Sequence, residues 1–201
     1  MPIVPLSGNH DGRIGAKSVK CGVENSLVSH FYLENPIYEK NSKGAYFSFV
    51  YKNATFVVLN TNAVNSEDEL DEKQYKWALG VAEKCKTKWK ILLTHKSPYS
   101  NGPHHKDPDV KKIGKQIKKL AYYGNFDLVL GAHDHVYART HFLNMDVVVK
   151  NERAVKNKKE GISEAYKNPL GTVFVVPGTS GVKNYRQHFP IDFPAYKLLD
   201  I

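Results

Sequence analysis

Cysteine and methionine are scarce in this sequence, with two of each among 201 residues. Cys21 and Cys85 lack the CxxC spacing of thiolate metal sites, and two cysteines are too few for a disulfide framework. They are either free thiols or one disulfide. The cellular compartment therefore stays open.

Long apolar runs are also missing, because no stretch approaches the roughly 20 residues that cross a bilayer. The N-terminus, MPIVPLSGNHD, lacks the charged, apolar and small-residue zones of a signal peptide. We expect a soluble chain without a membrane span. Secretion of a longer form stays open, as does the oligomeric state.

Acidic residues are outnumbered, with 20 Asp and Glu against 29 Lys and Arg and a formal net charge of +9. Much of the excess lies in residues 111–119 and 150–159. A positive surface attracts anionic substrates such as phosphate esters. No aromatic residues interleave these lysines, as single-stranded nucleic acid would require. These lysines are therefore interpreted as a solvated surface and not as a nucleic-acid binding patch. No nucleic-acid partner is expected.

The pattern of apolar residues predicts an α/β fold in one domain. Two segments rich in aromatic and β-branched residues, 45–51 and 54–60, predict a hairpin. Amphipathic periodicity predicts helices over 67–86 and 108–123. The remaining assignments are strands at 3–6, 90–94, 126–130, 136–149 and 171–176, a loop at 13–43 and a surface excursion at 150–166. Together they predict a mixed β-sandwich flanked by helices.

Histidines follow three of the predicted strands. His10 comes after the first, His95 after the strand at 90–94, and His133 and His135 after the strand at 126–130. Because ligands collect at the carboxyl ends of strands in open α/β sheets, these side chains are expected to converge. Imidazole is the commonest metal ligand, and Asn9 adds an oxygen donor. This donor set suits zinc, manganese or iron.

Each of these elements also has a structural interpretation. A single histidine after a strand is more often a hydrogen-bonded structural residue than a ligand. An Asn-His pair in a glycine-bounded loop is typical of turns. Coincidence explains poorly why GNHD, Thr-His and His-Asp-His occur together, in this order, after apolar strands.

These motifs resemble those of calcineurin-like metallophosphoesterases. Residues 8–11 match the GNH[DE] motif, residues 92–95 the VxxH motif, and residues 132–135 the GHxH motif. Among these proteins the sequence is most similar to purple acid phosphatases. The further similarities are Tyr137 and Arg139 after the HxH pair, Asn60 to Asn62, Gln74 to Trp77, Ser97 to Tyr99, His104 with His105, and Gly171 to Gly181.

The resemblance implies a binuclear metal centre. The more labile divalent ion would be bound by Asn9, His95 and His133. The second ion, usually iron in purple acid phosphatases and paired with zinc or manganese, would be bound by His135. The two ions would clamp the phosphoryl oxygens and share a bridging hydroxide that attacks phosphorus.

The resemblance also implies the residues that handle the substrate. His10 would contact the phosphate and protonate the leaving oxygen, oriented by Asp11. His104, His105 or both would contact the phosphoryl group. The chain is thus expected to be a phosphoric monoester hydrolase acting on a small phosphorylated substrate. Two alternatives stay open: a non-catalytic metal-binding or interaction domain, and a phosphodiesterase or nuclease of the same superfamily.

The sequence departs from the family pattern in two places. The family begins with two aspartate motifs, DxG or DxH and then GDxxY, whereas this sequence contains no Gly-Asp dipeptide. We therefore expect residues 1–201 to form a single partial catalytic domain, a fragment whose missing strands complete the sheet. Ala132 also replaces the glycine of GHxH, and alanine does not relieve a positive φ angle.

Overall fold

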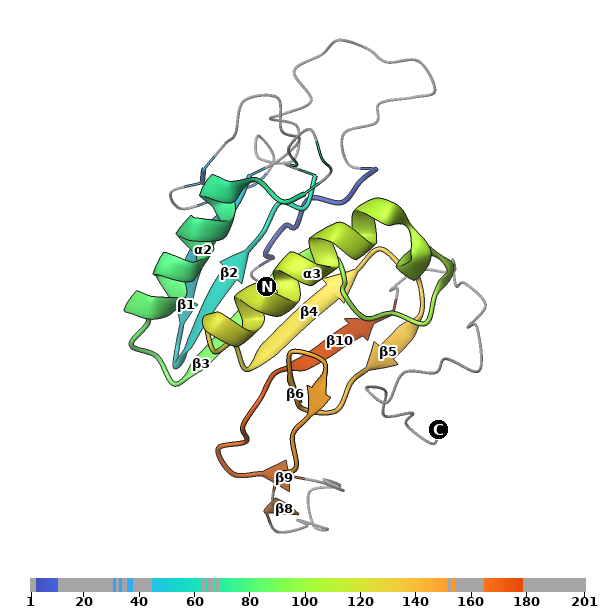
Figure 1. Cartoon of the computed structure of the whole chain (residues 1–201). Helices are drawn as coiled ribbons and strands as arrows, with labels where there is room; N and C mark the ends of the chain where they lie inside the picture. Colours follow the sequence, from blue (N-terminus) through green and yellow to red (C-terminus); the bar gives the residue numbers. More distant parts are fainter. Residues whose placement is uncertain are drawn as a thin grey trace, which may run out of the picture.

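The computed structural model describes residues 3–10, 31, 33, 36–37, 45–62, 64, 67, 69–151, 153–154 and 165–178. Within them one large sheet carries two long helices (Figure 1). The loop predicted over residues 13–43 lies almost entirely outside the described residues.

The large sheet has six strands in the order β1-β2-β3-β4-β10-β5. The inner four strands run parallel, and β1 and β5 pair antiparallel at the two edges. The mixed sheet with flanking helices predicted from the sequence is therefore confirmed. The strands are β1 (Phe47–Tyr51), β2 (Ala54–Val58), β3 (Trp89–Lys96), β4 (Leu128–Ala132), β10 (Val173–Pro177) and β5 (Tyr137–Arg139).

The predicted hairpin is formed by β1 and β2, paired from Phe47 and Val58 to Tyr51 and Ala54. Two residues join the strands, and the first of them, Lys52, has φ 51°. Two-residue hairpin loops favour such left-handed conformations because their twist matches that of the strands.

The strand predicted at 136–149 is wrong as a continuous element. The chain instead forms β5 and then a two-stranded ribbon of β6 (Leu143–Asn144) and β7 (Val147–Val148). The reversal takes place at Met145, which has φ 55°. Its neighbour Asp146 accepts hydrogen bonds from Tyr99 Oη and Lys118 Nζ, which fix the turn against the body of the protein.

Two further segments also differ from their predictions, namely the strand predicted at 3–6 and the surface excursion predicted at 150–166. Residues 3–6 form no strand, because a strand needs a hydrogen-bonded neighbour and the described residues offer this segment none. Within 150–166, β8 (Arg153–Ala154) pairs with β9 (Ala165–Tyr166), and the residues between them lie outside the described ranges.

The two predicted helices are present as α2 (Glu72–Lys84) and α3 (Pro108–Tyr123). Helix α2 begins later than expected because the Asp71 carboxylate accepts from the backbone N–H groups of Lys73 and Gln74. This side chain caps the helix, so the acidic residues before it lie outside. Helix α3 has its predicted bounds, with proline at its first position.

The core lies between the helices and the sheet. Both helices lie in front of the sheet in Figure 1, and α3 contacts both β3 and α2. Strand residues Val57, Leu92 and Val129 are fully buried, as are Ile113 and Ile117 of α3. Burying each such side chain contributes about 1.5–3 kcal/mol. This packing holds the inner strands, whose carboxyl ends carry the histidines.

The alternate residues of the same strands are only partly buried. Ile91 and Leu93 of β3, Leu128 and Leu130 of β4, and Val175 of β10 have intermediate exposure. Because side chains alternate across a sheet, these five belong to the face opposite Leu92 and Val129. Within the described residues this second face is apolar and incompletely covered.

Candidate metal centre

Two neighbouring parallel strands bring His95 and His133 together. His95 is the second-to-last residue of β3, and His133 directly follows β4. Since Lys96 pairs with Ala132, both strands end at the same edge of the sheet. His95 Nε2 lies 3.1 Å from His133 Nδ1. The two histidines therefore lie side by side, as expected from their positions after the strands.

Asn9 joins this pair from the loop at the start of the chain. Its Oδ1 atom lies 2.9 Å from His95 Nε2. The loop is held by Asn62, whose Nδ2 donates to the carbonyl oxygens of Gly8 at 3.1 Å and Ser7 at 3.3 Å. Three donor atoms from separate parts of the chain thus meet at one point.

A buried glutamine supports the segment that carries Asn62. Gln74, which is 0% exposed, accepts from the backbone N–H of Asn60 at 2.7 Å and donates to its carbonyl at 3.1 Å. The side chain of Asn60 in turn accepts from the backbone N–H of Asn62 at 3.1 Å. These bonds connect helix α2 to the loop that presents Asn9.

His133 has an unusual backbone conformation, with φ 73°. Positive φ is uncommon for residues other than glycine and is found where the surrounding structure enforces it. Ala132, which replaces the family's glycine, is not among the residues with positive φ. The left-handed position of the turn therefore falls on the proposed ligand itself.

His104 is carried by the short helix η2 (Pro103–Lys106). Its Nδ1 lies 2.8 Å from Asp107 Oδ2, and its backbone N–H donates to Asp134 Oδ1 at 3.0 Å. Asp134 is 3% exposed and lies between His133 and His135. The loop with His104 is thus tied to the His-Asp-His turn.

His105 lies differently from its neighbour. Its Nδ1 donates to the carbonyl oxygen of Gly102 within the same loop. A cleft of about 340 Å³ opens beside the metal-ligand candidates, and His104 lines it whereas His105 does not. The lining residues are Leu6, Gly8, Asn9, His10, His95, His104, His133 and His135.

Seven of the eight predicted site residues can be placed. Six of them line the cleft, whereas His105 is not among the lining residues and bonds to Gly102 within its own loop. The eighth, Asp11, lies outside the described residues.

Burial keeps the central histidines neutral. The pKa of His95 is lowered to about 3, first by burial and then by the neighbouring His133 and Lys96. The pKa of His133 is also lowered, by burial and by His104. At neutral pH both imidazoles are therefore uncharged, the form that binds metal ions.

The distances fit a metal shell. Ligands at about 2.0–2.2 Å from a zinc-type ion lie about 3–3.5 Å from one another. The separations of 2.9 Å and 3.1 Å around His95 Nε2 are close to that range. Two nitrogens and one oxygen form a donor set suited to zinc, manganese or iron. The residues present therefore fit a divalent metal ion.

Three residues that support the site were not predicted as site residues: Asn62, Asp107 and Asp134. Asn62 lies within a segment that had been noted, and Asp134 lies inside the HDH motif. Asp107 follows the His104-His105 pair by two residues. Only proximity to a motif marked them, and their hydrogen bonds depend on the tertiary fold.

Fold and site together define an α/β protein with histidine and asparagine donors at the carboxyl edge of its sheet. The chain belongs to the calcineurin-like phosphoesterase family, whose sequence model matches residues 1–137. The family that the sequence motifs indicated is therefore confirmed.

A solved structure shares the fold. The purple acid phosphatase PPD1 from yellow lupin (Lupinus luteus) seeds superposes with a TM-score of 0.64 at 20% sequence identity. The match covers 95% of this chain and 33% of the lupin chain, so this chain spans about a third of that protein. A search of curated protein sequences gave no match. Among the described residues, no helix is long and apolar enough to cross a membrane.

Proposed function

We propose that this chain carries ligands of a metal-dependent phosphoesterase that hydrolyses phosphate monoesters. Membership of the calcineurin-like family supports the reaction class. One observation carries the proposal: Asn9 Oδ1, His95 Nε2 and His133 Nδ1 meet beside a cleft that His10 and His104 also line. The preference for monoesters rests on the likeness to purple acid phosphatases.

The metal ligands follow from this arrangement. Asn9, His95 and His133 would hold one divalent ion, and His135, which lines the same cleft, would contribute to a second. Iron with zinc or manganese is the pair that the likeness to purple acid phosphatases favours. When bound, such ions polarise phosphoryl oxygens and activate water.

The other histidines of the cleft would act on the substrate. His10 would hydrogen-bond a phosphoryl oxygen and donate a proton to the leaving oxygen. His104, whose Nδ1 donates to Asp107, would in its doubly protonated form also donate from Nε2 to a phosphoryl oxygen. Neutral His95 and His133 add no positive charge that would repel a cation.

Hydrolysis of p-nitrophenyl phosphate tests the proposal. Turnover is expected with added zinc, manganese or iron and is expected to vanish with EDTA. Because a positioned general acid contributes about 10²–10⁴-fold, His10→Ala should lower kcat by about 100-fold or more. The matched control is His141→Ala, which removes a histidine outside the cleft lining. Absence of metal-dependent turnover, or equal rates for both variants, would contradict the proposal.

Bis(p-nitrophenyl) phosphate distinguishes a monoesterase from a diesterase. We expect a higher kcat/KM on the monoester under the same metal conditions. A higher value on the diester would assign the site to phosphodiester hydrolysis instead, with the metal ligands unchanged.

A non-catalytic metal-binding domain is the second candidate. Among the described residues that line the cleft there is no carboxylate, and two close cations need an anion to offset their repulsion. Elemental analysis of protein dialysed against zinc separates the two functions. Two ions per chain support the enzyme, and a single ion without turnover supports the binding domain.

A further inference from the structure

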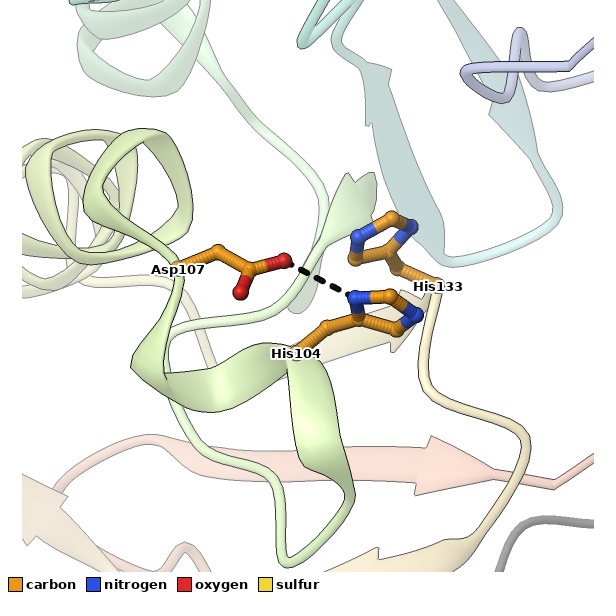
Figure 2. A group of neighbouring side chains, drawn as sticks. All are labelled: His104, Asp107 and His133. Atoms are coloured by element: carbon orange, nitrogen blue, oxygen red, sulfur yellow. Dashed lines mark hydrogen bonds and ion pairs between the residues drawn. The ribbon is translucent and has the colours of Figure 1, made fainter.

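A second group of metal-ligand atoms lies beside the first. His104, Asp107 and His133 each offer one ligand atom, and these atoms lie within 4.8 Å of one another. Figure 2 shows the Asp107 carboxylate hydrogen-bonded to the His104 ring, with the His133 ring close to both. We propose that these three residues form a separate site for one zinc-type divalent ion, which competes with the Asn9–His95 pair for His133.

The donor set supports this assignment. Two histidines and one carboxylate are a known three-ligand combination for zinc, with water in the fourth position. Asp107 also supplies the negative charge that the group of Asn9, His95 and His133 lacks. A cation at the second group is therefore partly neutralised by its own ligands.

The backbone holds the two new ligands in place. Asp107 ends η2 and precedes α3, and its backbone N–H donates to the His104 carbonyl at 3.0 Å. The backbone of His104 is fixed in turn by Asp134. His104 Nδ1 and Asp107 Oδ2 are already 2.8 Å apart, close to the separation of ligands on one ion. Only small side-chain movements are needed to admit a cation.

The site is open to an ion and its water. The His104 side chain is 35% exposed and that of Asp107 45% exposed, so entry requires no opening of the core. His104 would exchange its Nδ1 proton for one on Nε2, a change of tautomer with no net release of a proton. The ion would then replace the hydrogen bond between the two side chains.

His133 is the shared member of both groups. Its Nδ1 faces His95, and Figure 2 shows a ring nitrogen on the side of Asp107 and a second nitrogen directed away from it. A neutral imidazole has only one lone pair for a metal. A cation at one group therefore weakens binding at the other. This competition rests on the proposed function, because it assumes that Asn9, His95 and His133 bind a metal ion. Binding of an ion at the second group does not depend on hydrolysis.

The test removes the first group and asks whether a cation is still bound. His95→Ala deletes a ligand of the first group and leaves all three members of the second. We expect this variant to bind one Co²⁺ ion, with visible absorption bands of nitrogen and oxygen coordination. Adding Asp107→Asn should weaken that binding by at least about tenfold, as should adding His104→Ala.

A matched control removes a carboxylate elsewhere. Glu72→Gln in the His95→Ala background deletes an exposed carboxylate of α2 and should leave the Co²⁺ affinity unchanged. Circular dichroism checks each variant for folding, and Asn9→Ala replaces His95→Ala if the latter does not fold. Failure of the His95→Ala protein to bind Co²⁺, or equal affinity with and without Asp107, would overturn the site. Neither result depends on phosphatase activity.

Discussion

Gly102 packs so closely against Asp134 that no side chain fits between them. A Cβ atom placed on Gly102 would lie 2.7 Å from Asp134 Cβ and closer still to its carboxyl group. Asp134 is the residue that accepts from the His104 backbone. The position of His104 in the cleft therefore depends on a residue without a side chain.

Gly102→Ala is expected to displace Asp134 and the loop of His104. Because the backbone of Gly102 has φ −89°, alanine adopts it without strain, and the effect is steric. We expect a loss of about 1–3 kcal/mol in the free energy of unfolding, measured by urea denaturation. Gly80→Ala in α2 is the control, since nothing lies within 4 Å of its added Cβ and alanine favours helices by about 1 kcal/mol. Equal effects of the two substitutions would refute the steric explanation.

Gln74→Leu should destabilise the fold by leaving the N–H and carbonyl of Asn60 without partners. Each buried unpaired group costs about 1–3 kcal/mol, so a loss of several kcal/mol is expected in denaturant titrations. Gln116 bonds the backbone of Leu70 in the same way but in a partly exposed setting. Gln116→Leu should therefore have the smaller effect. The reverse order would show that burial of these bonds is not decisive.

The stability of the metal-free chain should fall at acid pH. The folded-state pKa of His95 is about 3 and its ordinary value is 6.5, so between these values only the unfolded chain takes up the proton. Below about pH 6.5 the free energy of unfolding should therefore decrease, by up to about 1.4 kcal/mol per pH unit for this one group. Thermal denaturation in EDTA across pH 4–7 measures the slope.

The variant His95→Gln assigns this slope. Glutamine does not titrate. The decrease in the free energy of unfolding below pH 6.5 should therefore become shallower, by up to about 1.4 kcal/mol per pH unit. His133 still contributes, because its pKa is lowered in the same direction. An unchanged slope would mean that other groups govern the acid sensitivity.

His104 and His105 should differ in their effect on substrate. His104 lines the cleft, whereas Nδ1 of His105 is directed to the Gly102 carbonyl within its own loop. His104→Ala is expected to raise KM for p-nitrophenyl phosphate and the inhibition constant of inorganic phosphate by about tenfold, the loss of one hydrogen bond to a charged group. His105→Ala should change both values less. A larger effect of His105→Ala would reverse the assignment.

Sequence periodicity predicted the parts of the fold that depend on one segment and its pattern. Helix α3 has its predicted bounds, and the β1–β2 hairpin turns at Lys52 and Asn53. The meeting of His95 and His133 also followed from the rule that parallel strands end at one edge.

Features set by distant contacts could not be predicted. The ribbon of β6 and β7 reverses because Asp146 is bound by Tyr99 and Lys118, which lie 47 and 28 residues away. Asp107 likewise looked like an ordinary residue before a proline. Its closeness to His133 depends on how η2 lies against the end of β4.

The order of strands in the sheet also bears on how fast the ligands assemble. Neighbours β2, β3, β4 and β10 are parallel and joined by long crossovers, and Asn9 meets His95 across 86 residues. Contacts of such sequence separation form slowly, because the intervening chain must be ordered before they are made. We therefore expect the three donor atoms to come together late in folding. The rate of metal binding during refolding should therefore match the rate at which the central sheet is completed.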